Sequence, residues 1–367
     1  MYLPRHIINI GRFVTMEITK DFLCGNIEIV KQDGDEFLLQ PETRGDTGYF
    51  YWMFRIDGAQ GRKVTFKFTT PDRVGFPGAA VSRNMTDWSW TGTKFTYDGK
   101  DGFTYDFAPD ETSVYFSQHM VYTPLNFERF VKNNGIEAKT FCKTRKKRDV
   151  PYFTVGNGER KVLVTSRQHA CESTGTYAVQ GFAEECMKTA LPGIEFIFVP
   201  FVDYDGVCDG DAGKNRSPHD HNRDYEEGIY PEIRKIKSIA ETQDLITNFD
   251  FHAPYHCGDI NDCTYFMRCD HEKGGIYDKF SSELVRLTSE NGFRYYGIHD
   301  IAYGAKWNED NMPNMISYMM KHTEKKYTFC MEIPFFGLPD NYFDQSRAFE
   351  LGRRVFKAAL SSGVFDR

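Results

Sequence analysis

The chain has 367 residues, of which 40% are hydrophobic and 26% are charged, and its formal net charge is −7 at pH 7. This length predicts two domains, or one large domain with an appendage, because a domain takes roughly 150 residues. The composition is that of a soluble globular protein, and the acidic balance argues against a nucleic-acid-binding protein, which usually carries a basic excess.

Neither a membrane segment nor a secretory signal is expected. No apolar run approaches the roughly 20 residues that span a bilayer, and the apolar patch in residues 1–13 is short and broken by Arg12. The nine cysteines have no paired spacing, which favours free thiols in a reducing compartment. We therefore expect a cytoplasmic protein with no membrane partner.

The first third of the chain is typical of strands and turns. Val64, Phe66 and Phe68 alternate with polar residues, which predicts a strand with one buried face. Residues 49–56 are apolar on both faces, as in a central strand. No long helical period occurs here, so residues 1–120 are predicted to form a small antiparallel β-sandwich domain.

A short basic run, Lys143 to Arg148 (KTRKKR), stands out after this region. It fits a localisation patch or a solvated loop, and the loop is favoured because such loops are far more common.

From about residue 150 onward, short apolar runs alternate with helical patterns. The predicted strands are residues 161–166, 194–199, 246–251, 263–267 and 327–331. Pro231 is a good first helical residue, and apolar residues at helical spacing follow near residues 280–287 and 348–358. This alternation predicts an α/β fold for residues 121–367, with a mixed, mainly parallel sheet flanked by helices.

Three side chains at strand ends could bind one metal ion. His169 and Glu172 lie three residues apart, directly after the predicted strand 161–166, and His252 follows the predicted strand 246–251. Two histidines and one glutamate make a zinc site with a position open to water, and bound zinc acidifies that water and polarises a substrate carbonyl. Taken alone, each histidine is more often a hydrogen-bonded core residue.

The surrounding sequence supports catalysis. Asn222 and Arg223, with Arg216 seven residues before Arg223, lie between the proposed ligands. Arginine grips a planar carboxylate with two hydrogen bonds, although a solvated polar loop has the same composition. Glu332 ends an apolar strand, where a carboxylate is uncommon unless it is paired or functional.

Together these segments resemble the carboxypeptidase A-type metallocarboxypeptidases, specifically their cytosolic carboxypeptidase branch. The branch pattern occurs in order: RQHACES, then FVPFVDYDGV, R-S (Arg216 and Ser217) and DHNR, then DFHAP, then YTFCMEIPFFG. The resemblance extends to the N-terminal half (YFYWMFRI, GRKVTFKF and YFSQHMVYTP) and covers nearly the whole chain from about residue 20. It implies a carboxypeptidase-like catalytic domain with a β-domain before it.

The resemblance also implies a role for each matching residue. His169, Glu172 and His252 would bind one zinc ion per chain, and Asp220 would orient a ligand histidine by a hydrogen bond.

Four further residues would act on the substrate. Arg216 would stabilise the oxyanion, Asn222 and Arg223 would hold the terminal carboxylate of the substrate, and Glu332 would activate water and protonate the leaving amine. The implied reaction is hydrolysis of the C-terminal peptide or isopeptide bond of a peptide or protein, releasing single amino acids.

The sequence departs from the family in places. Ala170 and Cys171 replace a common Pro-Gly, and His221 stands where leucine is frequent. For the substrate-closing tyrosine, Tyr303 and Tyr318 are both candidates, and Tyr303 is taken as the substrate-binding one.

Substrate preference and two further sites stay open. The branch includes enzymes that remove glutamate, and Lys306, Lys321 and Lys325 lie in a region that could form a basic pocket, which predicts a preference for acidic residues. The histidines and cysteines of residues 256–271 match no zinc spacing. Cys171 is read as a small loop residue, because no histidine–acid relay remains once His169 binds metal.

Two alternative functions are considered. One is an acyl-amino-acid amidohydrolase of aspartoacylase type, but such enzymes carry an extra domain after the catalytic glutamate, whereas only 35 residues follow Glu332 here. The other is a catalytically silent binding protein on the same fold, which would be expected to lose Glu332 or a metal ligand. The sequence leaves the oligomeric state unknown.

Overall fold

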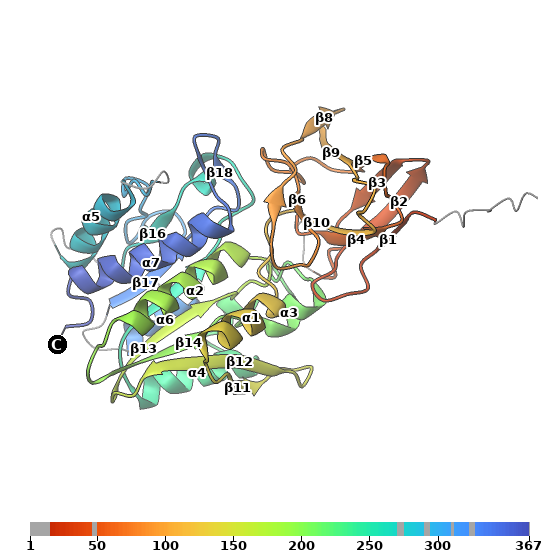
Figure 1. Cartoon of the computed structure of the whole chain (residues 1–367). Coiled ribbons are helices and arrows are strands. Elements are labelled where there is room, and N and C mark those ends of the chain that lie inside the picture. The colour runs from red at the N-terminus through yellow and green to blue at the C-terminus, as the bar shows by residue number, and fades with distance from the viewer. Residues whose placement is uncertain are drawn as a thin grey trace, which may run out of the picture.

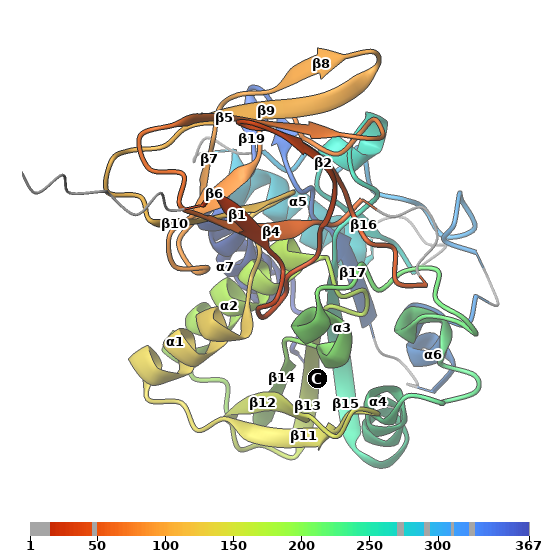
Figure 2. The same cartoon turned by 90° about the vertical axis from the view of Figure 1, so that its right-hand side faces the viewer.

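The computed structural model describes residues 15–45, 50–269, 275–289, 294–309, 312–322 and 327–366. In this part of the chain, two five-stranded sheets precede a seven-stranded sheet that is flanked by helices. Figures 1 and 2 show the two N-terminal sheets at one end of the α/β part.

The two N-terminal sheets pack face to face around aromatic side chains. One sheet has the order β1 (Glu17–Thr19), β4 (Met53–Asp57), β10 (Ser113–Ser117), β6 (Ala80–Ser82) and β7 (Ser89–Trp90). The other has the order β2 (Glu28–Asp33), β3 (Glu36–Gln40), β5 (Lys63–Phe68), β9 (Lys100–Asp106) and β8 (Phe95–Tyr97). Phe54 and Phe116 of the first sheet contact Phe66 of the second, with ring centroids 5.3 Å from Phe66 in both cases.

This region confirms the predicted small antiparallel sandwich with one exception. Val64, Phe66 and Phe68 are all buried, as their alternation predicts. The exception is the pair β3 and β5, whose strands run parallel. Local alternation identifies the buried face of a strand, but the direction of its neighbour depends on the path of the chain between them.

The seven-stranded sheet is mixed, with a parallel centre and antiparallel edges. Its order is β11 (Lys139–Lys143), β12 (Asp149–Gly156), β14 (Ile194–Val199), β13 (Arg160–Ser166), β15 (Asp244–His252), β17 (Tyr327–Glu332) and β16 (Tyr265–Met267). The four central strands are parallel, and β11, β12 and β16 pair antiparallel with their neighbours. This arrangement confirms the predicted sheet, although β16 is shorter than the predicted strand 263–267.

Helices cover both faces of this sheet. Helices α1 (Pro124–Asn134), α2 (Ser173–Lys188), α5 (Ile276–Thr288) and α7 (Gln345–Ser361) share one core with it. Helices α4 (Pro231–Thr242) and α6 (Met315–His322) contribute to a second core, and Figure 1 shows α4 on the opposite side of the sheet from α2 and α7. The short elements α3 (Tyr204–Asp209), η1 (His221–Arg223), η2 (Asp259–Asp262), β18 (Gly337–Leu338) and β19 (Asn341–Tyr342) lie in the connections.

Helix α2 gives no clear helical period in the sequence because it is buried on most sides. Its Gly181 and Gly352 of α7 allow the two helices to touch through their backbones. A Cβ at either glycine would lie 1.8 Å from a backbone oxygen of the other helix. This close contact fixes α2, which begins directly after Glu172.

The N-terminal sheets contact the α/β part through polar and aromatic groups. The Trp88 backbone N–H donates to Gln345 Oε1 at 2.7 Å, and the Trp90 indole N–H donates to the Phe343 carbonyl at 3.1 Å. The Phe50 ring lies 4.7 Å from that of His256. The predicted boundary between residues 120 and 121 stays a prediction.

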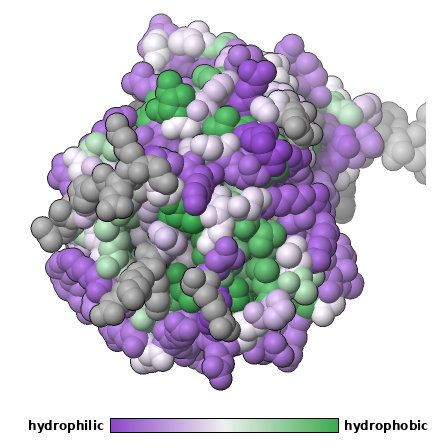
Figure 3. Space-filling view, turned by 90° about the vertical axis from the view of Figure 1, so that its left-hand side faces the viewer, coloured by the Kyte–Doolittle hydropathy of each residue, from purple (hydrophilic) through white to green (hydrophobic). Residues whose placement is uncertain are grey.

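Figure 3 shows a face on which apolar residues lie in groups between polar ones. Among the described residues, no helix is long and apolar enough to cross a bilayer.

Candidate metal centre and active site

The carboxyl ends of three parallel strands bring the proposed site together. β13 ends at Ser166, and the loop after it carries His169 and Glu172 up to the start of α2. His252 is the last residue of β15, and Glu332, its partner in register, is the last residue of β17. Since neighbouring parallel strands end at the same edge of a sheet, these side chains meet there.

A buried arginine holds the loop that carries His169 and Glu172. Arg167 has a φ of +62°, and its guanidinium donates to the carbonyls of Ala170 (2.5 Å) and Tyr122 (3.1 Å) and to Ser173 Oγ (2.8 Å). These bonds hold the loop against Ser173, the first residue of α2, and against Tyr122, which lies shortly before α1.

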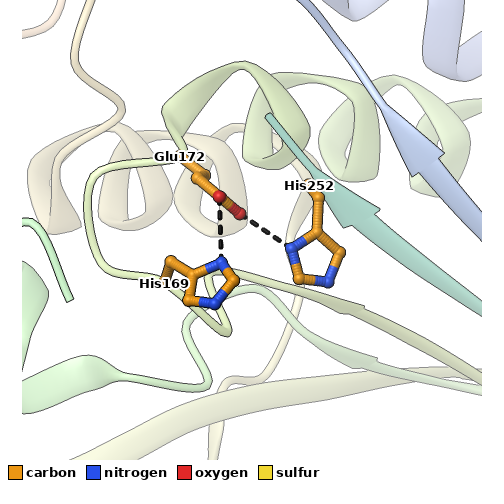
Figure 4. A group of neighbouring side chains, drawn as sticks. All are labelled: His169, Glu172 and His252. Carbon is orange, nitrogen blue, oxygen red and sulfur yellow. Dashed lines mark hydrogen bonds and ion pairs between the residues drawn. The ribbon is translucent and has the colours of Figure 1, made fainter. Parts of the chain in front are cut away.

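The Glu172 carboxylate lies between two imidazole rings, as Figure 4 shows. Its Oε1 is 2.9 Å from His169 Nδ1, and its Oε2 is 2.8 Å from His252 Nδ1. All three side chains are buried, and their ligand atoms lie within 4.8 Å of one another. Among the described residues this is the only such group of histidine, cysteine and carboxylate side chains.

The second nitrogen of each histidine faces another carboxylate. His252 Nε2 lies 2.9 Å from Asp250 Oδ2, and His169 Nε2 lies 3.5 Å from Asp220 Oδ1. The other Asp250 oxygen accepts a 2.6 Å hydrogen bond from Thr165 Oγ1. A histidine that binds metal through one nitrogen usually donates the other N–H to a carboxylate in this way.

The local charges oppose the effect of burial. Burial lowers the pKa of His252, but Asp250 and Glu172 raise it, and the resulting pKa lies well above the usual value. Burial raises the pKa of Glu172, but His169, Lys214 and His252 lower it well below its usual range. The carboxylate is therefore held ionised, as a metal ligand must be.

The donor set fits a divalent metal ion. Two Nδ1 atoms and one carboxylate converge from elements that packing holds in place, and the other nitrogen of each histidine lies near an aspartate oxygen. Three protein ligands leave a coordination position for water or substrate.

A cavity of about 470 Å³ opens beside this group. Its lining includes Asp220, Asn222, Arg223 and Glu332, so four more of the residues singled out from the sequence lie around it. Asn222 Oδ1 accepts a 3.3 Å hydrogen bond from the backbone N–H of Met315, which begins α6.

Glu332 points a buried carboxylate oxygen into this region. Its Oε2 has no hydrogen-bond partner among the described residues. Burial raises the pKa of Glu332, while His252 lowers it and Glu172 raises it, and the net pKa is above the usual value. A basic oxygen beside this candidate metal centre is suited to proton transfer.

Arg216 lies outside the cavity lining, and its role at the oxyanion stays a prediction. Its guanidinium makes ion pairs with Asp203 (2.7 Å) and Asp211 (3.0 Å), and it is not among the lining residues. Asp203 is fully buried and caps α3 through the Gly206 N–H, so it requires a cation, and Arg216 supplies that charge.

Neither candidate tyrosine lines the cavity. The loop of Tyr303 closes on itself through the Gly304 N–H and the Asn308 carbonyl, 2.8 Å apart, and directs Trp307 to the cavity instead. Tyr318 is buried in α6, and its hydroxyl donates to Glu241. The role of Tyr303 as a substrate contact therefore stays a prediction.

The lining residues that were not singled out from the sequence include Lys214, Asp250 and Tyr265. Asp250 precedes His252 by two residues on the same strand, so the two side chains share a face, and this spacing was a usable signal. Tyr265 pairs with Glu332 across β16 and β17, and its buried hydroxyl has no partner among the described residues. No feature of the local sequence identifies Lys214 as a residue that lines the cavity.

The remaining hypotheses from the sequence concern the basic run, a second metal site and Cys171. The basic run forms the turn between β11 and β12, where Lys146 and Arg148 make ion pairs with Asp209. No metal-binding group forms from the described histidines and cysteines of residues 256–269, and His271 lies outside the described residues. Cys171 is buried in the loop between His169 and α2.

Known structures with the same fold are metallocarboxypeptidases. A metallocarboxypeptidase from Burkholderia cenocepacia superposes with a TM-score of 0.77 at 19% identity, covering 95% of this chain and 99% of the other. One from Pseudomonas aeruginosa, in complex with (2-guanidinoethylmercapto)succinic acid, superposes with a TM-score of 0.74 at 17% identity, covering 94% and 98%. These matches confirm the carboxypeptidase-like fold.

Relatives found by sequence are also distant in identity. An uncharacterised protein of Zymomonas mobilis is 23% identical over 88% of both chains. Cytosolic carboxypeptidase 2 of Danio rerio is 23% identical over 65% of this chain, which spans 41% of that protein. No protein-family profile matches the chain.

Proposed function

We propose that this protein is a zinc-dependent carboxypeptidase that hydrolyses the C-terminal peptide or isopeptide bond of its substrate and releases single amino acids. The observation that carries the proposal is the meeting of His169, Glu172 and His252 with Arg223 and Glu332 on one cavity. This arrangement is suited to substrates that end in a carboxylate.

Zinc is the metal that two imidazoles and one carboxylate most often bind in hydrolases. Bound there, it would supply a Lewis acid that polarises the scissile carbonyl and acidifies water.

The protein residues then have separate tasks. His169, Glu172 and His252 hold the metal, while Asp220 and Asp250 keep the imidazoles in the required orientation. The Glu332 carboxylate accepts a proton from the attacking water and passes it to the departing nitrogen. Its position at the end of β17, in register with His252, supports this role.

Asn222 and Arg223 would hold the terminal carboxylate of the substrate. Both line the cavity, and an arginine can offer a carboxylate two parallel hydrogen bonds. Their place on the short helix η1, directly after Asp220, links carboxylate binding to the orientation of His169.

The acidic preference expected from the sequence remains the first proposal for specificity, and an apolar last residue is the alternative, because both cationic and apolar side chains line the cavity. Lys306 and Lys321 are exposed and do not line the cavity, and Lys325 lies outside the described residues. Met267, Ile316 and Cys330 contribute apolar surface to the lining. Peptides that differ only in a last residue of Glu, Lys or Leu will decide between these preferences.

The proposed cellular location and domain division are those predicted from the sequence. We propose a cytoplasmic enzyme whose catalytic domain comprises residues 121–367, with residues 1–120 as a separate β-domain.

The test is hydrolysis by purified, zinc-loaded protein. Peptides with a free C-terminal carboxylate are expected to lose one residue at a time, whereas C-terminally amidated peptides resist. N-acyl amino acids serve as the third substrate class. Their preferential hydrolysis would favour the amidohydrolase alternative, and zinc binding without hydrolysis of any class would favour the silent binding protein.

A further inference from the structure

A lysine contacts the Glu172 carboxylate in addition to the two imidazoles. The Lys214 Nζ atom lies 2.5 Å from Glu172 Oε1, the same oxygen that lies 2.9 Å from His169 Nδ1. Glu172 is 0% exposed, and the Lys214 side chain is only 13% exposed. Because a buried carboxylate is stable only when it is paired and hydrogen-bonded, the ammonium of Lys214 stabilises Glu172.

The chain before Lys214 fixes the point from which its side chain extends. Gly213 has a φ of +82°, and a Cβ at this position would lie 2.3 Å from the Ala170 backbone nitrogen. Ala170 directly follows His169, so the backbone at Gly213 rests on the loop that carries two of the proposed ligands. The ammonium of Lys214 therefore lies beside the candidate metal centre because of the fold of this loop.

The position of the ammonium conflicts with a metal ion on the same carboxylate. Because a zinc–carboxylate bond is about 2.0–2.2 Å long, an ion on Glu172 Oε1 would lie within about 5 Å of the Lys214 Nζ atom. Two positive centres at this separation repel each other, and the repulsion is strong where little water separates them. The ion and the ammonium therefore compete for Glu172.

Lys214 has a second acceptor within reach. Its Nζ atom donates to the Ala253 carbonyl at 3.3 Å, and Ala253 directly follows the proposed ligand His252. A backbone carbonyl is neutral and is not a member of the proposed ligand set. The ammonium can therefore keep this hydrogen bond after it leaves Glu172, which avoids a buried donor without an acceptor.

We propose that Lys214 is an internal competitor of the metal ion: its ammonium holds the Glu172 carboxylate before the ion binds, and the ion displaces it from that carboxylate. This inference rests on the metal binding that the proposed function requires. Lys214 is a positioning residue in this scheme, since it acts on the ion through Glu172. It stabilises the ligand group of the metal-free protein, and it weakens zinc binding because its ion pair with Glu172 must be broken.

The test compares zinc binding by the parent protein, three variants of Lys214 and one control. Lys214→Leu removes the charge and adds no metal-binding atom, and Lys214→Arg keeps a charge. Lys214→Gln keeps a hydrogen-bond donor for Glu172 without the charge, so it gives the same comparison if Lys214→Leu fails to fold. Lys188 ends α2 and its side chain is 57% exposed, so Lys188→Leu controls for the change in net charge.

Two quantities are measured on each protein. One is the zinc dissociation constant, by competition with a chromophoric chelator at neutral pH, and the other is the unfolding temperature with and without zinc. Lys214→Leu is expected to bind zinc about 10–100-fold more tightly than the parent protein, because a charge-assisted hydrogen bond no longer has to be broken. Its metal-free form should unfold at a lower temperature than the metal-free parent protein, and zinc should raise that temperature by more.

The other variants separate the charge from the shape of the side chain. Lys214→Gln should bind zinc more tightly than the parent protein and less tightly than Lys214→Leu, since a neutral amide is more easily displaced than an ammonium. Lys214→Arg and Lys188→Leu should stay within a few-fold of the parent zinc affinity.

Unchanged or weaker zinc binding in either neutral variant that folds would overturn the inference, because the loss of a lysine that merely supported Glu172 as a ligand would lower the affinity. Equal tightening in Lys214→Arg and Lys214→Leu would also overturn it, since the charge would then have no part. The proposed function fails on a different result. A parent protein that binds zinc but cleaves no peptide rejects the carboxypeptidase function and leaves the competition at Glu172 in place.

Discussion

Replacing Asp250 with asparagine tests whether the carboxylate behind His252 tunes the metal site. The Asp250 Oδ2 atom lies 2.9 Å from His252 Nε2, and Oδ1 accepts from Thr165 Oγ1 at 2.6 Å. Asparagine preserves the shape of the side chain but removes its charge and one acceptor. Only one of its two polar atoms can accept a hydrogen bond, so either His252 or Thr165 must change its role.

The expected loss follows from the burial of this pair. Asp250 and His252 are 1% and 2% exposed, so water does not replace the lost interaction. Removing an orienting carboxylate typically weakens metal binding by about 10–100-fold, which corresponds to about 1.4–2.7 kcal/mol. Asp220 lies farther from His169 Nε2, at 3.5 Å, so Asp220→Asn should cost less than Asp250→Asn.

The assay is competition for zinc against a chromophoric chelator at neutral pH, on parent, Asp250→Asn and Asp220→Asn proteins. Thermal unfolding of the metal-free proteins controls for damage to the fold. An Asp250→Asn protein with the parent zinc affinity would refute the reasoning, as would a larger loss in Asp220→Asn.

Three further predictions concern catalysis, recognition and acid stability. Glu332→Gln should bind zinc and substrate but lose at least about 10²-fold in kcat; a near-parent rate would make Glu332 structural. Arg223→Ala should lose about 2–5 kcal/mol of discrimination for a free terminal carboxylate over an amide, measured as the ratio of kcat/KM values, and an unchanged ratio would remove Arg223 from that role. Burial, with Arg73 and Lys94, lowers the pKa of His256 from 6.5 to about 3. The unfolded chain therefore binds a proton below pH 6.5 that the folded protein excludes, and stability should fall by up to about 1.4 kcal/mol per pH unit down to about pH 3. His256→Asn should flatten this slope in urea unfolding at pH 7 and pH 4.5, whereas the exposed control His322→Asn should not.

The sequence by itself determined the elements and the ligand group. Strands such as β5 and β14 are recognisable because alternating or continuous apolar residues must be buried in a sheet. The spacing of His169 and Glu172 after one strand, with His252 and Glu332 ending two others, placed them at one edge once the strands were taken as parallel. These inferences need only local pattern and strand direction.

The tertiary structure decided which neighbouring side chains face the cavity. Arg216 and Lys214 are two residues apart in one loop, and nothing local distinguishes them. The choice depends on Asp203, a buried carboxylate after β14 that holds Arg216, and on the contact of Gly213 with Ala170 that aims Lys214 at Glu172. Tyr265 likewise reaches the cavity only because β16 pairs antiparallel with β17. Loop side chains are oriented by charges and backbone contacts that are distant in sequence, and only the folded chain brings these together.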